Sequence, residues 1–210
     1  MTTPIDVFVD YVCPFCFLVE PALDELARTR YVAVTIRPFE LRPDPVPTLR
    51  PEDDYLPRVW RDAVYPMAER VGVPVTLPSV SPQPRTDKAF LVLQLARERG
   101  LAHEYSTAMF AAFFQRDCDI GREDEIIAVA TEVGLDAEEA AAALGSEQRR
   151  EQHRTDLEFA VREVGIDAVP GVVVGGLPGG ELLRGVPSAK RLVAAVDRTR
   201  QVADPTGRAS

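Results

Sequence analysis

A short β-type segment leads directly into two cysteines that open a helical pattern, and this arrangement constrains the fold more than any other feature of the chain. Residues 5–10 are rich in β-branched and aromatic types, which favours a strand. The motif Cys13-Pro14-Phe15-Cys16 follows, and apolar residues then recur at helical spacing from Pro14 to about Thr29. Residues 31–39 have the composition of a second strand. The short connections predict a parallel βαβ unit.

The remainder of the chain changes to helical patterns and then back to strands. A proline-rich stretch over residues 42–57 is expected to form a loop. Nearly all of residues 86–164 are compatible with helices, and Asp136 stands where a helix N-cap is expected. Residues 171–174 and 181–184 then predict a hairpin followed by a last helix. This order predicts an α/β fold in which a domain is interrupted by a helical insertion. The expected bounds are 1–57 and 165–202 for the interrupted domain, 58–164 for the inserted all-helical domain, and 203–210 for a flexible tail.

Charge and hydropathy restrict the partners of the chain. A formal net charge of −9 argues against a surface for nucleic acids, because phosphate binding depends on clustered Lys and Arg. No stretch approaches the roughly 20 apolar residues of a membrane helix, and the first residues lack the pattern of a secretory signal. We therefore expect a cytoplasmic protein with no nucleic acid or membrane partner. In a reducing compartment, a close cysteine pair is catalytic or metal-binding more often than structural.

The spacing of the two cysteines predicts different roles for them. Residues at i and i+3 lie about one helical turn apart, so both sulfurs are near enough to join. The helix N-terminus stabilises an anion, which favours the thiolate at Cys13, and a thiolate is the attacking species in disulfide exchange. Cys13 is thus expected to be the nucleophile and Cys16 the resolving thiol. Asp10 is a candidate proton relay to the buried thiol, although an acidic residue that closes a strand is more often a turn or cap residue.

Zinc binding is the main alternative for a pair of cysteines at this spacing. A structural zinc site needs four ligands, commonly including a second close pair. Outside the motif the chain offers only Cys118, His103 and His153, and none of these is paired at ligand spacing. No metal is therefore expected. Cys118 lies between acidic neighbours that oppose a thiolate, so a structural or incidental thiol is the favoured interpretation.

The segment Val169-Pro170-Gly171 supplies a second indication of function. An X–Pro bond tolerates the cis form at about 0.5–1 kcal/mol. A cis bond here would expose the backbone of Val169, so that an extended substrate pairs with it beside the cysteines by strand addition. Pro14, Phe15, Val169 and Pro170 are therefore the expected substrate contacts. The alternative is an ordinary trans proline that opens a strand.

Taken together, these segments resemble the DsbA family of thioredoxin-like oxidoreductases, and most closely its cytoplasmic FrnE-like branch. The similar segments are residues 10–16, Arg37-Pro38-Phe39-Glu40-Leu41, Phe110–Gly121, Val133-Gly134-Leu135 and Val169-Pro170-Gly171. The resemblance implies a thioredoxin-like fold with an inserted helical domain, an exposed nucleophile at Cys13, a resolving thiol at Cys16 and a cis bond before Pro170. It also implies disulfide exchange with a dithiol or disulfide protein. The Pro-Phe spacer differs from the Pro-His and Pro-Trp spacers of that family, which leaves the redox potential open.

Two alternative functions remain. Hydroxychromene-carboxylate isomerases and kappa-type glutathione transferases share the fold and usually carry serine where Cys13 stands. A glutathione-dependent isomerase or transferase, acting on a small molecule such as an aromatic polyketide, would use glutathione as a co-substrate and no tightly bound cofactor. The second alternative is a non-catalytic redox-sensing module. A homodimer is compatible with each of these functions.

Overall fold

The strands β1 (Thr3–Val9) and β2 (Val32–Pro38) lie side by side and parallel, which confirms the predicted βαβ unit. The helical segment between them is divided into α1 (Pro14–Leu18) and α2 (Glu20–Thr29), whereas the apolar spacing predicts one continuous helix. Pro21 accounts for the division, because proline has no backbone N–H to donate to a carbonyl one turn earlier. The cysteine motif is thus carried by a short element of its own ahead of α2.

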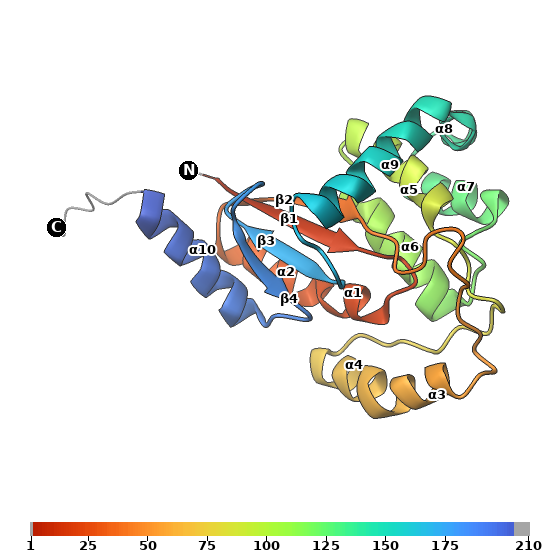
Figure 1. Ribbon diagram of the computed structural model, residues 1–210, viewed down its shortest axis with the longest axis horizontal. Coiled ribbons are helices and arrows are strands. Elements are labelled where there is room, and N and C mark those ends of the chain that lie inside the picture. Colours follow the sequence, from red (N-terminus) through yellow and green to blue (C-terminus); the bar gives the residue numbers. More distant parts are fainter. Residues whose placement is uncertain (1, 204–210) are drawn as a thin grey trace.

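A helical insertion separates β2 from the later strands in this computed structural model, which describes residues 2–203 (Figure 1). Its helices run from Tyr55 to Arg162, and the predicted division of the chain into two domains stays a prediction. The tail predicted for residues 203–210 lies outside the described residues, except for Ala203. The elements of the insertion are α3 (Tyr55–Val59), a π-helical turn η1 (Trp60–Val64), α4 (Tyr65–Val71), α5 (Asp87–Glu98), α6 (Ala102–Arg116), α7 (Glu123–Glu132), α8 (Ala137–Gly145) and α9 (Glu147–Arg162).

A β-hairpin and a last helix complete the fold as the sequence predicts. The strands β3 (Gly171–Val174) and β4 (Glu181–Arg184) pair antiparallel, and α10 (Ala189–Ala203) follows them. The four-stranded sheet has the order β2-β1-β3-β4, with β3 antiparallel to β1. Its α/β arrangement is a thioredoxin-like fold with a helical insertion. None of the helices among residues 2–203 combines the length and the apolarity needed to cross a bilayer.

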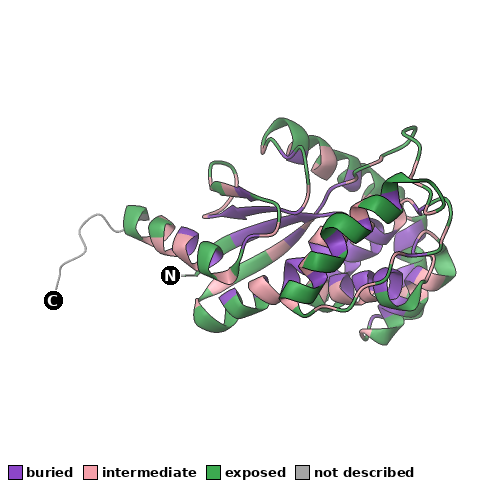
Figure 2. Cartoon of the chain, turned by 90° about the horizontal axis from the view of Figure 1, so that it is seen from below, coloured by how far each residue is buried: buried purple, intermediate pink, exposed green. Residues whose placement is uncertain are grey.

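The two faces of the sheet are covered by different helices. Side chains along a strand alternate between the faces, so Val7 lies in the large core whereas its neighbour Phe8 lies in a smaller cluster with Ala160 of α9. The helices α2 and α10 pack together and supply Leu26 and Leu192 to the large core. Figure 2 shows the buried residues gathered in the sheet and on the inner sides of the insertion helices.

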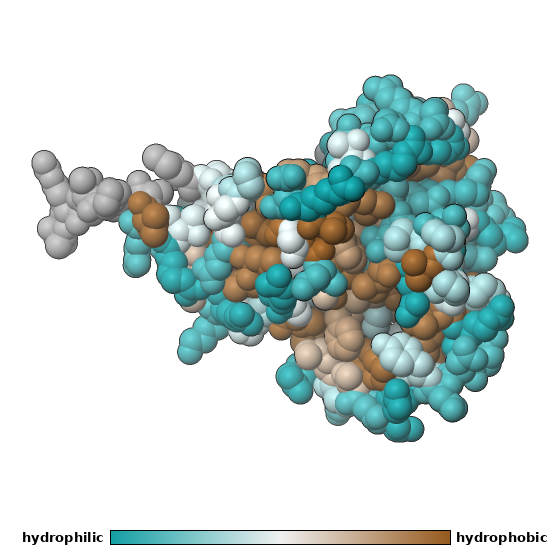
Figure 3. Space-filling view, in the orientation of Figure 1, coloured by the Kyte–Doolittle hydropathy of each residue, from teal (hydrophilic) through white to brown (hydrophobic). Residues whose placement is uncertain are grey.

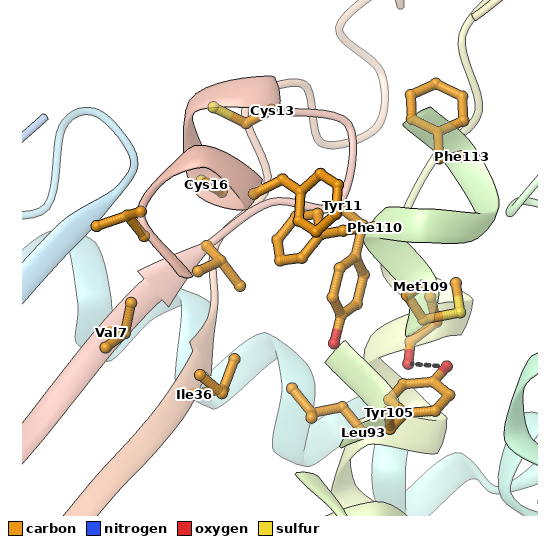
Figure 4. Packing of buried hydrophobic residues seen from close by; sticks show 14 of the residues in the cluster. Val7, Tyr11, Cys13, Cys16, Ile36, Leu93, Tyr105, Met109, Phe110 and Phe113 are labelled. Atoms are coloured by element: carbon orange, nitrogen blue, oxygen red, sulfur yellow. Dashed lines mark hydrogen bonds between the residues drawn. The ribbon is translucent and has the colours of Figure 1, made fainter. Parts of the chain in front are cut away.

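Aromatic residues join the sheet to the insertion in one continuous core. Tyr11, just beyond the end of β1, stacks on Phe90 of α5 with ring centroids 4.7 Å apart and meets Phe110 of α6 edge-on at 5.2 Å. Phe17 of α1 stacks on the same Phe110 at 5.5 Å. The hydroxyl groups of Tyr11 and Ser106 form a buried hydrogen bond of 2.9 Å. The insertion therefore packs directly behind the cysteine motif and holds it in place (Figure 4).

Asp136 is the N-cap residue of α8, as the sequence predicts, and its replacement gives a stability test. One oxygen of its carboxylate accepts the backbone N–H groups of Glu138 and Glu139, each at 2.9 Å. Replacing Asp136 with alanine is expected to lower the free energy of unfolding by about 1 kcal/mol, because two N–H groups lose their partner. Urea denaturation measures this loss. The exposed Asp53 provides a control, and an equal loss in Asp53→Ala would contradict the capping role.

Candidate active site

Cys13 lies at the N-cap position of α1, where the strand-like backbone after β1 turns into the helix. Its backbone is extended, with φ −93° and ψ 109°, and its thiol donates a hydrogen bond of 3.6 Å to the carbonyl of Val169. The exposed nucleophile implied by the family resemblance is wrong in one respect, because only 5% of Cys13 is exposed. Segments of the insertion that follow β2 and precede α5 enclose the motif, so the thiol opens into a cavity rather than onto a free surface.

Cys16 lies one turn further along α1 and is fully buried. Both thiols of the motif are free. Burial raises the pKa of the Cys16 thiol well above its ordinary value, and the neighbouring Cys13 thiol raises it further. A hydrogen bond from the backbone of Asp10 opposes this shift. Cys16 therefore needs a base to become an effective nucleophile near neutral pH. In Figure 4 the two cysteines are seen on the same short helix, against the aromatic side chains of the insertion.

The loop before β3 reaches the cysteine motif, as predicted. The Val169–Pro170 peptide bond is cis, which agrees with the family resemblance. Pro170 is buried, whereas Val169 is half-buried and lines the same cavity as Cys13. Pro14 and Phe15 line that cavity too. The structure thus brings three of the predicted substrate contacts to the cavity beside the Cys13 thiol, whereas Pro170 does not line it.

Asp10 is a buried carboxyl group beside the motif, with 1% of its surface exposed. One carboxyl oxygen accepts the hydroxyl of Thr86 at 2.8 Å and the N–H of Val12 at 3.4 Å, and the other accepts the N–H of Leu41 at 2.8 Å. The contact with Val12 is local and fits the turn role that the sequence suggests for Asp10. The contacts with Leu41 and Thr86 join segments that are distant in the sequence. Burial raises the pKa of Asp10 to about 6, the three hydrogen bonds oppose the rise, and the charge of Glu40 adds to it.

A cavity of about 230 Å³ opens beside Cys13. It lies where the cysteine motif, the loop after β2, the segment before α5 and the α3–η1 region meet. Its lining contains both apolar and polar side chains. The lining residues include Asp10, Phe15, Leu56, Trp60, Gln83 and Thr86.

Four of these lining residues were not identified from the sequence, because only tertiary structure brings them to the motif: Leu56, Trp60, Gln83 and Thr86. Thr86 alone had a local indication, since it stands at the N-cap position of α5. A threonine there normally accepts an N–H of the helix. In this protein its side chain makes no capping bond and donates to Asp10 instead.

Neither histidine lines the cavity beside the cysteine pair. His153 of α9 is buried and lies 2.6 Å from the carboxylate of Glu40, with its ring stacked on Phe90. His103 of α6 faces Glu20 and Asp24 at 3.7 and 3.5 Å. Within residues 2–203, no group of three or more His, Cys, Asp or Glu side chains is arranged to hold a metal ion. Cys118 is half-buried, and its thiol faces the carbonyl of Arg116 at 3.8 Å.

Comparisons with known proteins agree with this architecture. The model of the DSBA-like thioredoxin domain matches residues 4–197. The uncharacterized protein YwbO of Bacillus subtilis (strain 168) is 43% identical over 176 residues, which cover 83% of this chain and 88% of that protein.

Solved structures with a similar fold include oxidoreductases and an isomerase. The probable DsbA oxidoreductase SCO1869 of Streptomyces coelicolor has a TM-score of 0.75 at 21% identity, over 99% of this chain and 92% of that one. The cytosolic disulfide reductase DsbM of Pseudomonas aeruginosa has a TM-score of 0.67 at 17% identity, over 96% and 97%, and was also solved with GSH. The 2-hydroxychromene-2-carboxylate isomerase has a TM-score of 0.71 at 16% identity, over 96% and 97%.

The solved structures establish the fold. The family model establishes the family of the chain, because its match spans nearly all residues from the start of β1 into α10. The cysteine motif, the buried carboxyl and the loop before β3 lie within the matched residues. This chain therefore belongs to the DSBA-like thioredoxin domain family.

Proposed function

We propose that this protein is a thiol–disulfide oxidoreductase that uses Cys13 and Cys16 as its redox pair. The observation that carries the proposal is the contrast between the two thiols. Cys13 opens into a cavity, whereas Cys16 is fully buried one turn away and has a raised pKa. Such a pair suits an attacking thiol followed by a resolving thiol.

The exchange proceeds in two steps that balance. The thiolate of Cys13 attacks one sulfur of a substrate disulfide, forms a mixed disulfide and releases the other substrate sulfur, which takes up a proton. The Cys16 thiol then loses its proton and attacks the sulfur of Cys13, so that the second substrate thiol leaves. The substrate disulfide has gained two electrons, and the enzyme has become the Cys13–Cys16 disulfide. The reverse sequence oxidises a substrate dithiol.

Asp10 is the group that we propose accepts the proton of Cys16. A carboxylate offers about four acceptor sites, and three hydrogen bonds occupy Asp10 in the structure. One site is left for the proton of the thiol, directly or through a water molecule. With a pKa of about 6, Asp10 is mostly ionised at pH 7 and close to the value that suits a base at that pH.

The surface near the motif supports a protein or peptide as the substrate. Figure 3 shows hydrophobic residues gathered on the face of the molecule between the hairpin and the α3–α4 region, around α1. The backbone of Val169 adjoins the Cys13 thiol and offers a partner for an extended chain. A docked disulfide segment would therefore meet main-chain groups and apolar side chains together.

We further propose that the protein works in the cytoplasm and that glutathione is the thiol which reduces its disulfide. The similarity in fold to DsbM, described as a cytosolic disulfide reductase and solved with GSH, supports this assignment. Self-association is proposed as well, and sedimentation velocity on the full chain measures it.

Turnover of model substrates tests the proposed function against its alternatives. The expected result is catalysed reduction of insulin by dithiothreitol, at a rate proportional to enzyme concentration, with no conjugation of glutathione to 1-chloro-2,4-dinitrobenzene. Conjugation without disulfide exchange would favour the glutathione-dependent isomerase or transferase, for which the fold shared with the carboxylate isomerase is the supporting observation. Formation of a Cys13–Cys16 disulfide without any turnover would favour the redox-sensing module.

A further inference from the structure

The side chain of Gln83 stands out within the cavity beside Cys13. Three polar residues of the lining are buried, and two of them, Asp10 and Thr86, bond to each other. Gln83 is the third, with 6% of its surface exposed. Its backbone N–H donates to the carbonyl of Leu49 at 2.7 Å, but its side-chain amide has no hydrogen-bond partner among residues 2–203. The buried side-chain atoms without a partner among these residues do not include the Gln83 amide, so the amide keeps access to the cavity and can bind a ligand there.

Apolar side chains also line the cavity. Trp60 and Leu56 are buried, and Phe15 of the cysteine motif lines the cavity with them. The nearby Arg85 is already engaged, because its guanidinium donates to the carbonyl of Arg42 at 2.8 Å and to that of Val46 at 3.1 Å. A ligand that fits this cavity therefore has an apolar part that contacts Trp60 and Leu56, and a polar group that hydrogen-bonds to the side-chain amide of Gln83.

The volume of the cavity limits the size of that ligand. Its 230 Å³ is less than the roughly 300–1,000 Å³ of pockets for drug-sized molecules. A cavity of this size suits one large side chain and the peptide group beside it. A whole polyketide would exceed this space.

We infer that the cavity receives a large apolar side chain flanking the reactive cysteine of a peptide disulfide, with its peptide group bound by the side-chain amide of Gln83. This inference rests on the proposed function and names its substrate class. The glutamine amide has both a donor and an acceptor, which match the C=O and N–H of a peptide group. The thiol of Cys13 and the carbonyl of Val169 adjoin the same cavity, so the neighbouring cysteine of the peptide would lie at the reacting sulfur.

Single-turnover reduction by the dithiol enzyme tests this inference without any variant. The substrates are the disulfide dimers of acetyl-Leu-Cys-Leu-amide and acetyl-Ser-Cys-Ser-amide, and bis(2-hydroxyethyl) disulfide, which has neither a peptide group nor a large apolar group. The wild type is expected to react at least about tenfold faster with the leucine peptide than with the serine peptide, the discrimination typical of an apolar pocket. Equal rates for the two peptides would overturn the inference.

Gln83→Leu tests the amide separately, because leucine keeps an apolar side chain of similar size and removes the hydrogen bonds. The ratio of the leucine-peptide rate to the bis(2-hydroxyethyl) disulfide rate is expected to fall about tenfold in this variant, the effect of one unpaired peptide group. Gln148→Leu, an equivalent change on the exposed side of α9, is expected to keep the wild-type ratio. An unchanged ratio in Gln83→Leu would overturn the inference while leaving the proposed function intact. A dithiol enzyme that reduces none of the three disulfides would overturn both.

Discussion

Replacing Cys13 with serine is expected to reduce the catalysed reduction of disulfides by more than about 10³-fold, the largest effect of any single substitution considered. The serine hydroxyl stays protonated near neutral pH and does not form a mixed disulfide. The Cys13 side chain is small and already buried, so the fold should persist. The insulin assay measures the loss, and circular dichroism verifies the folded state.

Two further substitutions make this expectation specific. Cys16→Ser should retain the first attack and lose resolution, so that the mixed disulfide on Cys13 accumulates and is visible by intact-mass spectrometry. Cys118→Ser is the matched control, because this half-buried thiol does not line the cavity beside Cys13, and the change is expected to leave turnover unchanged. Full turnover in Cys13→Ser, or a mixed disulfide formed on Cys16, would contradict the assigned roles.

Asp10→Asn is expected to slow the resolving step about 10²-fold at pH 7, because it removes the base that accepts the proton of Cys16. The asparagine carbonyl can still accept the N–H of Leu41, and its amide can donate to the hydroxyl of Thr86, so only the long 3.4 Å bond from Val12 is lost. In the wild type the resolving rate should rise with pH through about 6, the raised pKa of Asp10. Stopped-flow decay of a preformed mixed disulfide, followed from pH 5 to pH 8, measures this rate.

Thr86→Val distinguishes a proton-accepting role of Asp10 from a purely structural one. Valine has nearly the same shape as threonine but donates no hydrogen bond to the carboxylate. Because that bond lowers the pKa of Asp10, its loss should move the pH profile of the resolving step upward without abolishing the step. A profile that is the same in wild type, Thr86→Val and Asp10→Asn would exclude Asp10 as the base.

The same carboxyl group makes stability depend on pH. The folded pKa of about 6 lies above the ordinary value of 3.8, so the folded state holds the proton more tightly than the unfolded state. Stability from the protonated carboxyl is fully present below 3.8 and is lost as the pH rises through 6. Relative to Asp10→Asn, the free energy of unfolding of the wild type should fall by about 2 kcal/mol from pH 4 to pH 8. Urea denaturation at several pH values measures the difference, and parallel curves for the two proteins would contradict it.

The local features of the fold were predictable because they depend on near neighbours in the chain. The period of apolar residues gave the strand β1 and the hairpin, and capping chemistry gave the start of α8 at Asp136. The prediction failed in detail at Val19, where the effect of Pro21 divides one expected helix into α1 and α2. The motif identified Cys13 and Cys16 because their spacing alone places them one turn apart on a helix.

The sequence by itself therefore determined the two thiols, their order along a helix and the βαβ unit that presents them. Only the tertiary structure decided the surroundings of those thiols: the fully buried Cys16, the carboxyl of Asp10 held by Thr86 from 76 residues away, and the unpartnered Gln83. The physical reason is that a thiol's surroundings arise from burial and from contacts between distant segments. Helix spacing acts over a few residues, whereas the cavity exists only once the insertion has packed against the end of the sheet.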